Sequence, residues 1–413
     1  MSKNPKLIDK WFRTLPADAQ QAVRALVRLA EARGAPLYLV GGPLRDLLLG
    51  HPSLDIDLML EGDAPALASE LATTLGSRPK LHPAFGTATI RGDGWHIDLA
   101  TARRETYRRP GALPDVTPAS VGDDLRRRDF TINAMALRLD GPEAGVLLDP
   151  FGGQRDVAGR AIRVLHESSF QDDATRILRA ARYVARLRFR IDADTSRWLE
   201  RHARYLSEIS PARIHHEFAR IAAEHEPERA LVQLDARGVL PRIHPALRFG
   251  KDQERAMKEA RSRGAPVSSF WPILAFNVLP GPANTQASRL GLTRHQRAAV
   301  EGVPRLIQGI PTLFDVTNGA LVDVLDAFPH PTVWAVAMLV TPVADRLVEY
   351  LTTLRHVKPL LRGHDVIALG VPHGTQVGEV LRRLRVAKLD GEVRTRRDEE
   401  RFVRSLLAGA PAG

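Results

Sequence analysis

The stretch LVGGPLRDLLLGHPSLDIDLML, Leu39 to Leu60, decides the fold. An apolar strand leads into Gly41 and Gly42, and a short helical pattern begins at Pro43, a residue suited to the first helical turn. Glycines at such a turn let the backbone approach a ligand, and the exposed N–H groups of the helix start favour an anion. A Gly-Gly pair alone is more often a plain turn. Here we expect Gly42 and Arg45 to bind a phosphate, the arginine with two hydrogen bonds.

The same stretch ends in Asp55-Ile56-Asp57. In a strand, residues i and i+2 share one face about 6.6 Å apart, so both carboxylates point one way and Ile56 packs the other way. Adjacent carboxylates repel unless a cation lies between them, and hard oxygen ligands suit Mg²⁺. Such ions clamp the attacking and leaving oxygens of a phosphoryl displacement. A bare Asp-x-Asp is more often a solvated edge strand, but after Gly-Gly and Arg we interpret Asp55 and Asp57 as catalytic metal ligands.

A second element, RRRDFTINAM, runs from Arg126 to Met135. Three arginines followed by an apolar stretch with an embedded asparagine indicate a phosphate-facing cluster on a buried segment, or alternatively a solvated basic turn. The strand ahead of it, HIDLA, offers Asp98 as a possible third carboxylate, although an aspartate near a strand end is usually a turn former.

The third element is DDATRILRAAR, which begins at Asp172. Its arginines fall on one stripe of a helix, a pattern more often found on a solvated face; they are Arg176, Arg179, Arg182 and Arg186. Asp173 and Arg176, three residues apart, share a face and form an acceptor–donor pair. The carboxylate would accept from the exocyclic amine of C or A, and the guanidinium would donate to the ring acceptor beside it. U and G present other patterns and would be rejected.

The composition bounds the class of protein. The 413 residues include 59 Lys and Arg against 48 Asp and Glu, a net charge of +11. Such a surplus is typical of a protein that binds a polyanion, but an arginine-rich composition alone would also produce it. With no cysteine there is no disulfide partner and no thiolate metal site. The N-terminus has no signal-peptide pattern, and the most apolar stretch, Val333 to Val340, is far short of the ~18 residues of a membrane span. We expect a cytoplasmic protein without membrane contact.

The order of β-rich and helical patterns along the chain predicts an α+β protein. Short β-rich runs separated by Gly, Pro and Asp extend from Leu37 to about Val164, and the pattern is almost wholly helical from Asp172 onward. We predict five segments: a helical lead-in at 1–34, a catalytic head with a small mixed sheet at 35–165, a helical neck with the base-selecting motif at 166–225, a helical RNA-binding body at 226–345, and a helical tRNA-binding tail at 346–413.

Taken together, these motifs resemble the class II tRNA nucleotidyltransferase/bacterial poly(A) polymerase family, a branch of the polymerase-β-like nucleotidyltransferases. The likeness covers roughly residues 37–225, and the motifs follow the family's order. They are GGxxRD with DxD at Gly41, Gly42, Arg45, Asp46, Asp55 and Asp57; RRDFTINA at Arg127 to Ala134; DPFGG at Asp149 to Gly153; EDxxRxxR at Asp172, Asp173, Arg176 and Arg179; and SPxRI at Ser210 to Ile214.

The resemblance implies a polymerase-β-like head that uses Mg²⁺ and adds CCA, or only the terminal A, to the tRNA acceptor arm from CTP and ATP without a template. It implies that Arg128 contacts the nucleotide and that the base is selected at Asp173 and Arg176. Arg179 and Arg182 of the same stripe are expected to join them in nucleotide binding. One departure is Asp172, where the family has Glu. This variant, the loop ETYRRPGALPDV and the ending GHDVIALG…LDGEV resemble members that add only the A.

Three rival functions compete with this interpretation. A poly(A) polymerase has every motif and differs in whether synthesis stops, so product length separates the two activities. A non-catalytic RNA-binding relative would have lost a metal carboxylate, and both are present. A fused phosphohydrolase would need a spaced set of His and Asp, whereas His364-Asp365 is an isolated pair. The choice between CCA and A alone stays open at this point, as does the oligomeric state.

Overall fold

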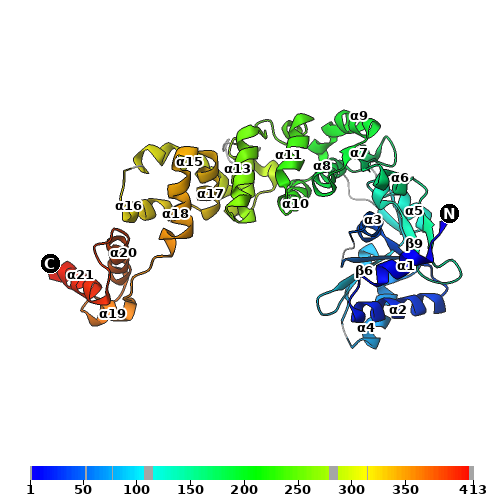
Figure 1. Cartoon of the computed structure of the whole chain (residues 1–413), viewed down its shortest axis with the longest axis horizontal. Helices are drawn as coiled ribbons and strands as arrows, with labels where there is room; N and C mark the ends of the chain where they lie inside the picture. Colours follow the sequence, from blue (N-terminus) through cyan, green and yellow to red (C-terminus); the bar gives the residue numbers. More distant parts are fainter. Residues whose placement is uncertain are drawn as a thin grey trace. The chain divides into compact units, whose positions relative to one another are not determined.

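The computed structural model describes residues 2–51, 54–76, 78–106, 115–278, 287–313 and 315–408. The chain forms two compact units, Met1–Arg242 and Ile243–Gly413. The described strands all belong to the first unit, and the second is helical wherever it has regular structure (Figure 1). This confirms the predicted α+β class. The five predicted segments remain a prediction, because the contacts divide the chain once, after Arg242.

A mixed sheet organises the first unit. In the described residues its strand order is β1-β10-β9-β2-β3-β6-β5-β4, with β3 and β6 parallel and every other neighbouring pair antiparallel. The strands are β1 (Ser2–Lys3), β2 (Leu37–Val40), β3 (Ile56–Leu60), β4 (Lys80–His82), β5 (Thr87–Arg91), β6 (His96–Thr101), β9 (Ala136–Arg138) and β10 (Val146–Leu148).

Apolar side chains cover both faces of the sheet's centre. Ile56, Leu58 and Leu60 alternate with Met59 along β3, so they point to opposite faces. Helix α4 (Ala64–Thr74) packs against β5 and β6, and α2 (Ala17–Ala32) packs against α4. Met59 instead joins a buried cluster with Leu125 of α5 (Val121–Arg126). The sheet is therefore a rigid platform whose strand ends carry the polar residues.

The lead-in differs from the helical prediction in one respect. It contains α1 (Pro5–Phe12) and α2, but it begins with β1, which pairs with β10 and so ties the chain start to the sheet edge. Beside the main sheet, β7 (Arg103–Thr106) pairs with β8 (Asp115–Pro118). Most of the loop ETYRRPGALPDV, residues 107–114, lies outside the described residues.

Helices follow the sheet along the chain. Helix α8 packs against α10 and α11, which buries most of its side chains. A two-stranded parallel pair, β11 (Ala161–Ile162) with β12 (Arg190–Ile191), interrupts this region, where the sequence predicts helix almost throughout. The helices are α6 (Gly153–Ala158), α7 (Ser169–Asp172), α8 (Thr175–Leu187), α9 (Ala193–His202), α10 (Pro211–Ala222) and α11 (Pro227–Ala236); α12 (Leu240–Ile243) crosses the division between the units.

The second unit has its own helical core. The apolar segment Val333 to Val340 falls largely within α17, whose residues Thr332 to Met338 are all buried. A further apolar cluster joins Leu361, Val366 and Leu384 near the chain end. The helices are α13 (Lys251–Ser262), α14 (Phe270–Ala275), α15 (Arg294–Gly309), α16 (Asn318–Leu325), α17 (His330–Leu339), α18 (Ala344–Thr352), α19 (Gly363–Ala368), α20 (Thr375–Leu389) and α21 (Arg396–Ala408).

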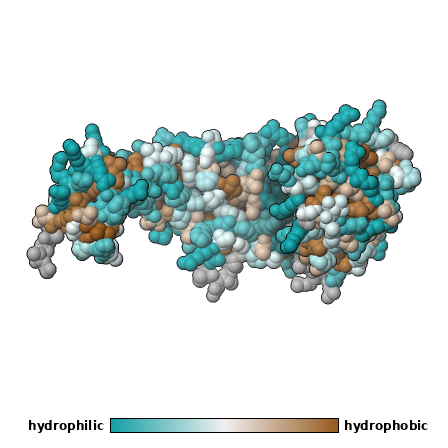
Figure 2. Space-filling view, turned by 90° about the horizontal axis from the view of Figure 1, so that it is seen from below, coloured by the Kyte–Doolittle hydropathy of each residue, from teal (hydrophilic) through white to brown (hydrophobic). Residues whose placement is uncertain are grey.

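In the part of the chain that the structure describes, no single helix is long and apolar enough to cross a membrane. Helix α17 and the segment Thr341–His356 reach that length and composition only together, across a bend of 117°. The face drawn in Figure 2 is polar over most of its area, with separate apolar patches.

Candidate active site

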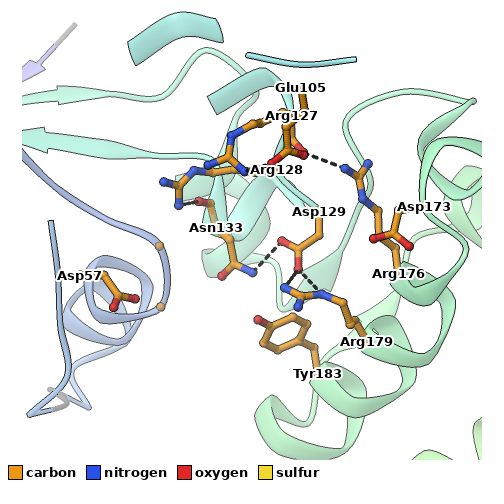
Figure 3. A pocket seen from close by; sticks show the side chains of 12 residues that line it. Asp57, Glu105, Arg127, Arg128, Asp129, Asn133, Asp173, Arg176, Arg179 and Tyr183 are labelled. Atoms are coloured by element: carbon orange, nitrogen blue, oxygen red, sulfur yellow. Dashed lines mark hydrogen bonds and ion pairs between the residues drawn. The ribbon is translucent and has the colours of Figure 1, made fainter. Parts of the chain in front are cut away.

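A polar cavity of about 350 Å³ lies in the first unit, where the start of α3 (Gly41–Leu49) meets α8. Figure 3 shows side chains from the sheet and its loops on one side of the cavity, and Arg176, Arg179 and Tyr183 of α8 on the other. Its described lining residues are Gly41, Gly42, Asp57, Glu105, Arg127, Arg128, Asp129, Asn133, Asp173, Arg176, Arg179 and Tyr183.

Gly41 is the point where the glycine turn, the aspartate strand and the arginine cluster meet. Its φ of 69° is one that side chains rarely adopt. A Cβ built there would lie 3.2 Å from Nη1 of Arg128 and 3.6 Å from Oδ2 of Asp57. Glycine suits this position because its φ is positive and because a Cβ would press closely against the Arg128 guanidinium. The backbone at the start of α3 is therefore held directly against an acidic and a basic group.

The strand pairing brings a further carboxylate beside Asp57. In the parallel register of β3 and β6, Asp57 is the partner of Asp98, which accepts a 2.6 Å hydrogen bond from Thr89. Burial and the negative charges of Asp98 and Asp55 raise the pKa of the Asp57 carboxyl to about 6, against the opposing charge of Arg128. Asp55 is exposed and directly precedes β3. This concentration of negative charge would be relieved by a cation.

The described residues contain no group of three or more His, Asp or Glu side chains arranged to hold a metal ion. This does not conflict with the carboxylate pair, because Mg²⁺ in phosphoryl-transfer sites takes one or two carboxylates and completes its shell with substrate phosphates and water. The donor set of Asp55 and Asp57 therefore fits a metal that arrives together with its nucleotide. Asp98 lies beside the pair but does not extend it to such a group.

Arg127 and Arg128 are both anchored on one buried carboxylate, Asp124, which is 1% exposed. Arg127 donates to its Oδ2 through Nε at 3.0 Å and Nη2 at 2.6 Å. Arg128 donates to its Oδ1 through Nε at 3.1 Å and Nη2 at 3.0 Å. The remaining edge of Arg127 reaches Glu105 at 2.9 Å. The basic cluster is thus a fixed structure and not a solvated turn.

Asp129 connects this cluster to α8. Its Oδ2 accepts two hydrogen bonds from Arg179, one of them from Nε at 2.9 Å, and its Oδ1 accepts from the Asn133 amide at 3.0 Å. Burial alone would raise the pKa of Asp129, but the charge of Arg179 and the hydrogen bond from Asn133 lower it to about 2. The carboxylate is therefore ionised at neutral pH, and it holds Arg179 at the cavity wall.

The predicted acceptor–donor pair lies where α7 meets α8. Asp173 Oδ1 accepts from the Thr175 amide at 2.9 Å, from the Thr175 hydroxyl at 2.7 Å and from Arg213 at 2.7 Å. Arg176 is 5% exposed and donates to the carbonyl oxygens of Arg127 at 2.7 Å and Ser169 at 3.3 Å. Both side chains line the cavity, and each is held by neighbours from distant parts of the sequence.

Asp172, the residue that departs from the family pattern, does not line this cavity. It lies 3.6 Å from the Nε2 of His166, in a neighbouring hollow of about 550 Å³ that also touches Arg127 and Arg176. Burial lowers the pKa of His166, against the negative charge of Asp172. Arg176 takes its orientation from main-chain carbonyls, as described above.

The cavity gathers most but not all of the predicted site residues. Gly42, Asp57, Arg128, Asp173, Arg176 and Arg179 line it. Arg45 is 2% exposed and donates to Asn133 and Asp46 at 2.8 Å each, so its guanidinium supports the wall from behind. Arg182 is buried too, stacked over Tyr183 and 3.4 Å from Glu224. The bidentate phosphate contact expected of Arg45 stays a prediction.

Other lining residues were not among the sequence candidates. Asp129 and Asn133 stand inside RRRDFTINAM, where polar and apolar residues alternate from Asp129 to Asn133, a signal that could have marked them. Tyr183 follows Arg176 by two helical turns and so shares its face. Glu105 carries no local signal, because the pairing of β7 with β8 and its contact with Arg127 bring it to the wall.

Comparison with known proteins decides the family. Residues 37–163 match the poly A polymerase head domain, and residues 188–249 match a probable RNA- and SrmB-binding site of polymerase A. The chain is 30% identical to an A-adding tRNA nucleotidyltransferase of Halalkalibacterium halodurans over 97% of this chain and 96% of that protein. This chain belongs to the tRNA nucleotidyltransferase/poly(A) polymerase family. It is a nucleotidyltransferase, and enzymes of this family generally use divalent metal ions.

Members of the family with different products resemble the chain to a similar degree. It is 33% identical to a CC-adding tRNA nucleotidyltransferase of Deinococcus radiodurans, covering 97% of both chains. It is also 33% identical to an A-adding enzyme of Geobacter sulfurreducens over 96% of this chain, although it spans only about half (48%) of that relative's length. A Thermotoga maritima CCA-adding enzyme in complex with tRNA superposes with a TM-score of 0.75 at 26% identity, covering 98% and 99% of the two chains.

The Asp129–Arg179 pair generates a prediction about pH. Because the pKa of Asp129 is about 2 in the folded protein, below the value of about 3.9 usual for an aspartate, its ionised form stabilises the fold above about pH 4. That contribution, about 2 kcal/mol, is lost as the pH falls from about 4 to about 2. Asp129→Asn should therefore lower the free energy of unfolding near pH 7 and matter progressively less in acid. Urea titrations of both proteins between pH 7 and pH 3 measure this, and a constant difference would contradict the assignment.

Proposed function

We propose that this chain adds nucleotides to the 3′ end of tRNA from CTP and ATP without a template, with the terminal A among its products. The observation that carries the proposal is the meeting, in one cavity, of the Gly41-Gly42 turn, Asp57 and Arg128 with the acceptor–donor pair of Asp173 and Arg176. The first group suits a triphosphate at a reacting centre, and the second suits the edge of a base. Relatives named A-adding, CC-adding and CCA-adding support the choice of substrate.

The triphosphate would lie against the start of α3. The backbone N–H groups of its first turn have no partners within the helix, and they carry the positive end of the helix dipole. Gly41 and Gly42 let phosphate oxygens reach those groups without meeting a side chain. Arg128, next to Gly41, supplies a fixed guanidinium on the same side. These groups bind the nucleotide and orient its α-phosphate toward Asp57.

Asp55 and Asp57 would hold divalent cations, for which we propose Mg²⁺. When bound, such ions stabilise the negative charge that develops on the phosphoryl oxygens and lower the pKa of the attacking 3′-hydroxyl. The raised pKa of Asp57 supports this, because burial and the neighbouring carboxylates both disfavour a bare negative charge there. Asp57 lines the cavity and Asp55 directly precedes its strand, so the RNA end and the α-phosphate would meet at the start of β3.

Base choice would depend on the hydrogen-bonding atoms of Asp173 and Arg176 that are not engaged within the protein. Oδ1 of Asp173 is occupied by Thr175 and Arg213, so Oδ2 is the atom available to accept from an exocyclic amine. Arg176 donates one N–H group to each of two carbonyl oxygens, and its guanidinium has five N–H groups in all. The pair thus presents an acceptor beside a donor, which matches C and A and opposes U and G.

The proposed function is tested by the products. The whole chain is incubated with tRNAs that end before CCA, after C and after CC, each with CTP or ATP alone. We expect a single A on the CC-ended tRNA with ATP. Incorporation from CTP on the shorter tRNAs would mark a full CCA activity. Long A tails on any RNA 3′ end would instead favour a poly(A) polymerase, and no incorporation with any pair would overturn the proposal.

Asp57→Asn should lower the rate of nucleotide addition by about a hundredfold or more, because it removes a carboxylate from the charge-stabilising centre. Binding of tRNA should change little, since Asp57 lies at the reacting centre and away from any surface that would hold an RNA stem. Asp93→Asn, in the turn between β5 and β6, provides the matched loss of one charge and should leave the rate unchanged. Single-turnover assays and filter binding separate the two effects. Normal turnover in Asp57→Asn would show that this carboxylate is structural.

Asp173→Ala should admit UTP and GTP, with selectivity falling about tenfold or more, as expected for loss of a bidentate base contact. Asp173→Asn is the sharper variant, because its amide oxygen can still accept from Thr175 and Arg213 while its NH₂ replaces Oδ2 by a donor. The control is Asp172→Ala, one residue away and turned toward His166. Mixed-nucleotide competition on a tRNA primer measures all three. An equal loss of rate for all four nucleotides would mean that the base is read elsewhere.

A further inference from the structure

Asp124 occupies an unusual position next to the candidate active site. It is 1% exposed and does not line the main cavity, yet it contacts two arginines that do. Each of its oxygens holds a different guanidinium: Oδ2 holds Arg127 and Oδ1 holds Arg128. The backbone N–H of Arg103 adds a weaker contact to Oδ2 at 3.4 Å. One buried carboxylate thus satisfies donors from two adjacent side chains and from the start of β7.

The two arginines depend on this carboxylate for their geometry. Adjacent guanidinium groups repel each other, and a free arginine side chain samples many rotamers. In both, the Nε–Nη2 edge is turned toward Asp124. The Nη1 atoms are left to face Glu105 in one case and, in the other, the Asn133 carbonyl at 3.2 Å. The same Nη1 of Arg128 lies beside Gly41.

We propose that Asp124 is a positioning residue for the incoming nucleotide: it fixes Arg127 and Arg128 as a rigid surface that binds the triphosphate beside Gly41. This inference rests on the proposed function. It assigns Asp124 no contact with substrate, and its effect passes entirely through the two guanidinium groups. Burial alone would raise the pKa of Asp124, but the charges of Arg128 and Arg127 lower it, so the carboxylate stays ionised while the nucleotide enters and leaves.

The conservative variant Asp124→Asn separates this role from a simple charge effect. An amide has one acceptor oxygen, so it can hold one arginine and must turn an NH₂ group toward the N–H edge of the other. The released guanidinium then keeps only its Nη1 contact, to Glu105 for Arg127 or to the Asn133 carbonyl for Arg128, and can turn away from the phosphate site. Asp173 and Arg176 keep their own partners, so base selection should be unaffected. A loss of triphosphate affinity without a loss of selectivity is therefore the specific expectation.

Asp123 provides a matched control on the same helix. It pairs with the exposed Arg104 at 3.0 Å and with Ser120, and it contacts neither Arg127 nor Arg128 in the described structure. Asp123→Asn makes the same chemical change one residue away. Both variants and the unaltered chain are assayed for the KM of ATP, the KM of tRNA, the preference among the four nucleotides, and the affinity for inorganic tripolyphosphate by titration calorimetry.

In Asp124→Asn we expect the KM for ATP and the dissociation constant of tripolyphosphate to rise about tenfold or more, the effect of losing a charge-assisted hydrogen-bonded contact. The KM for tRNA and the nucleotide preference should stay as in the unaltered chain, and Asp123→Asn should match it in every measurement. If both variants behave alike, or if the KM values for ATP and tRNA rise together, Asp124 has no positioning role.

Two further measurements keep the inference testable. If circular dichroism shows that Asp124→Asn does not fold, Asp124→Glu replaces it, because glutamate keeps the charge but displaces it by one methylene. Asp124→Glu should raise the KM for ATP without changing the KM for tRNA. An unchanged KM for ATP would overturn the inference. Failure of the proposed function is recognised separately, because the unaltered chain and Asp123→Asn would then add no nucleotide to tRNA, while the tripolyphosphate titrations would still report on Asp124.

Discussion

The absence of a side chain at Gly41 is the constraint on which the site depends. A strand carrying an acidic group and a segment carrying arginines both lie close to the start of α3 at this residue, whose backbone has a φ of 69° that favours glycine. Asp57 and Arg128 both come within contact distance of the space that a Cβ would fill. The sheet makes the approach rigid, since β2 and β3 are antiparallel neighbours and the turn follows directly from β2.

Around that turn, three arginines of the cavity wall are paired with buried carboxylates, whereas Arg176 is held by main-chain carbonyl oxygens. Asp124 holds Arg127 and Arg128, and Asp129 holds Arg179. Burying a charge without a partner would be costly, whereas a hydrogen-bonded pair can be buried and keeps its donors aimed in a fixed direction. The guanidinium groups are therefore oriented before any ligand arrives. This arrangement suits an enzyme that selects a nucleotide with side chains alone.

Residues of the glycine turn and the aspartate strand could be found in the sequence because their chemistry is local. Gly42 and Asp57 line the cavity as the spacing of the first motif predicts. Asp173 and Arg176 line it too, although Asp173 lies between α7 and α8 and only Arg176 is in the first turn of α8. Arg45 and Arg182 stand at equally suggestive spacings, yet their side chains are buried behind the wall. Periodicity indicates which residues share a face; it does not indicate whether that face meets solvent or another helix.

The sequence by itself determined the α+β class, the order of the motifs and the chemistry available at each, because turn residues, alternation and helical spacing act over a few neighbours. Only the tertiary structure decided which charges meet. Asp124 reaches Arg127 and Arg128 within one turn, but Asp129 meets Arg179, Asp173 meets Arg213 and Asp57 meets Asp98 across 40 to 50 residues. Those contacts follow from strand register and helix packing, which depend on the burial of the whole core and leave no mark in any single stretch of sequence.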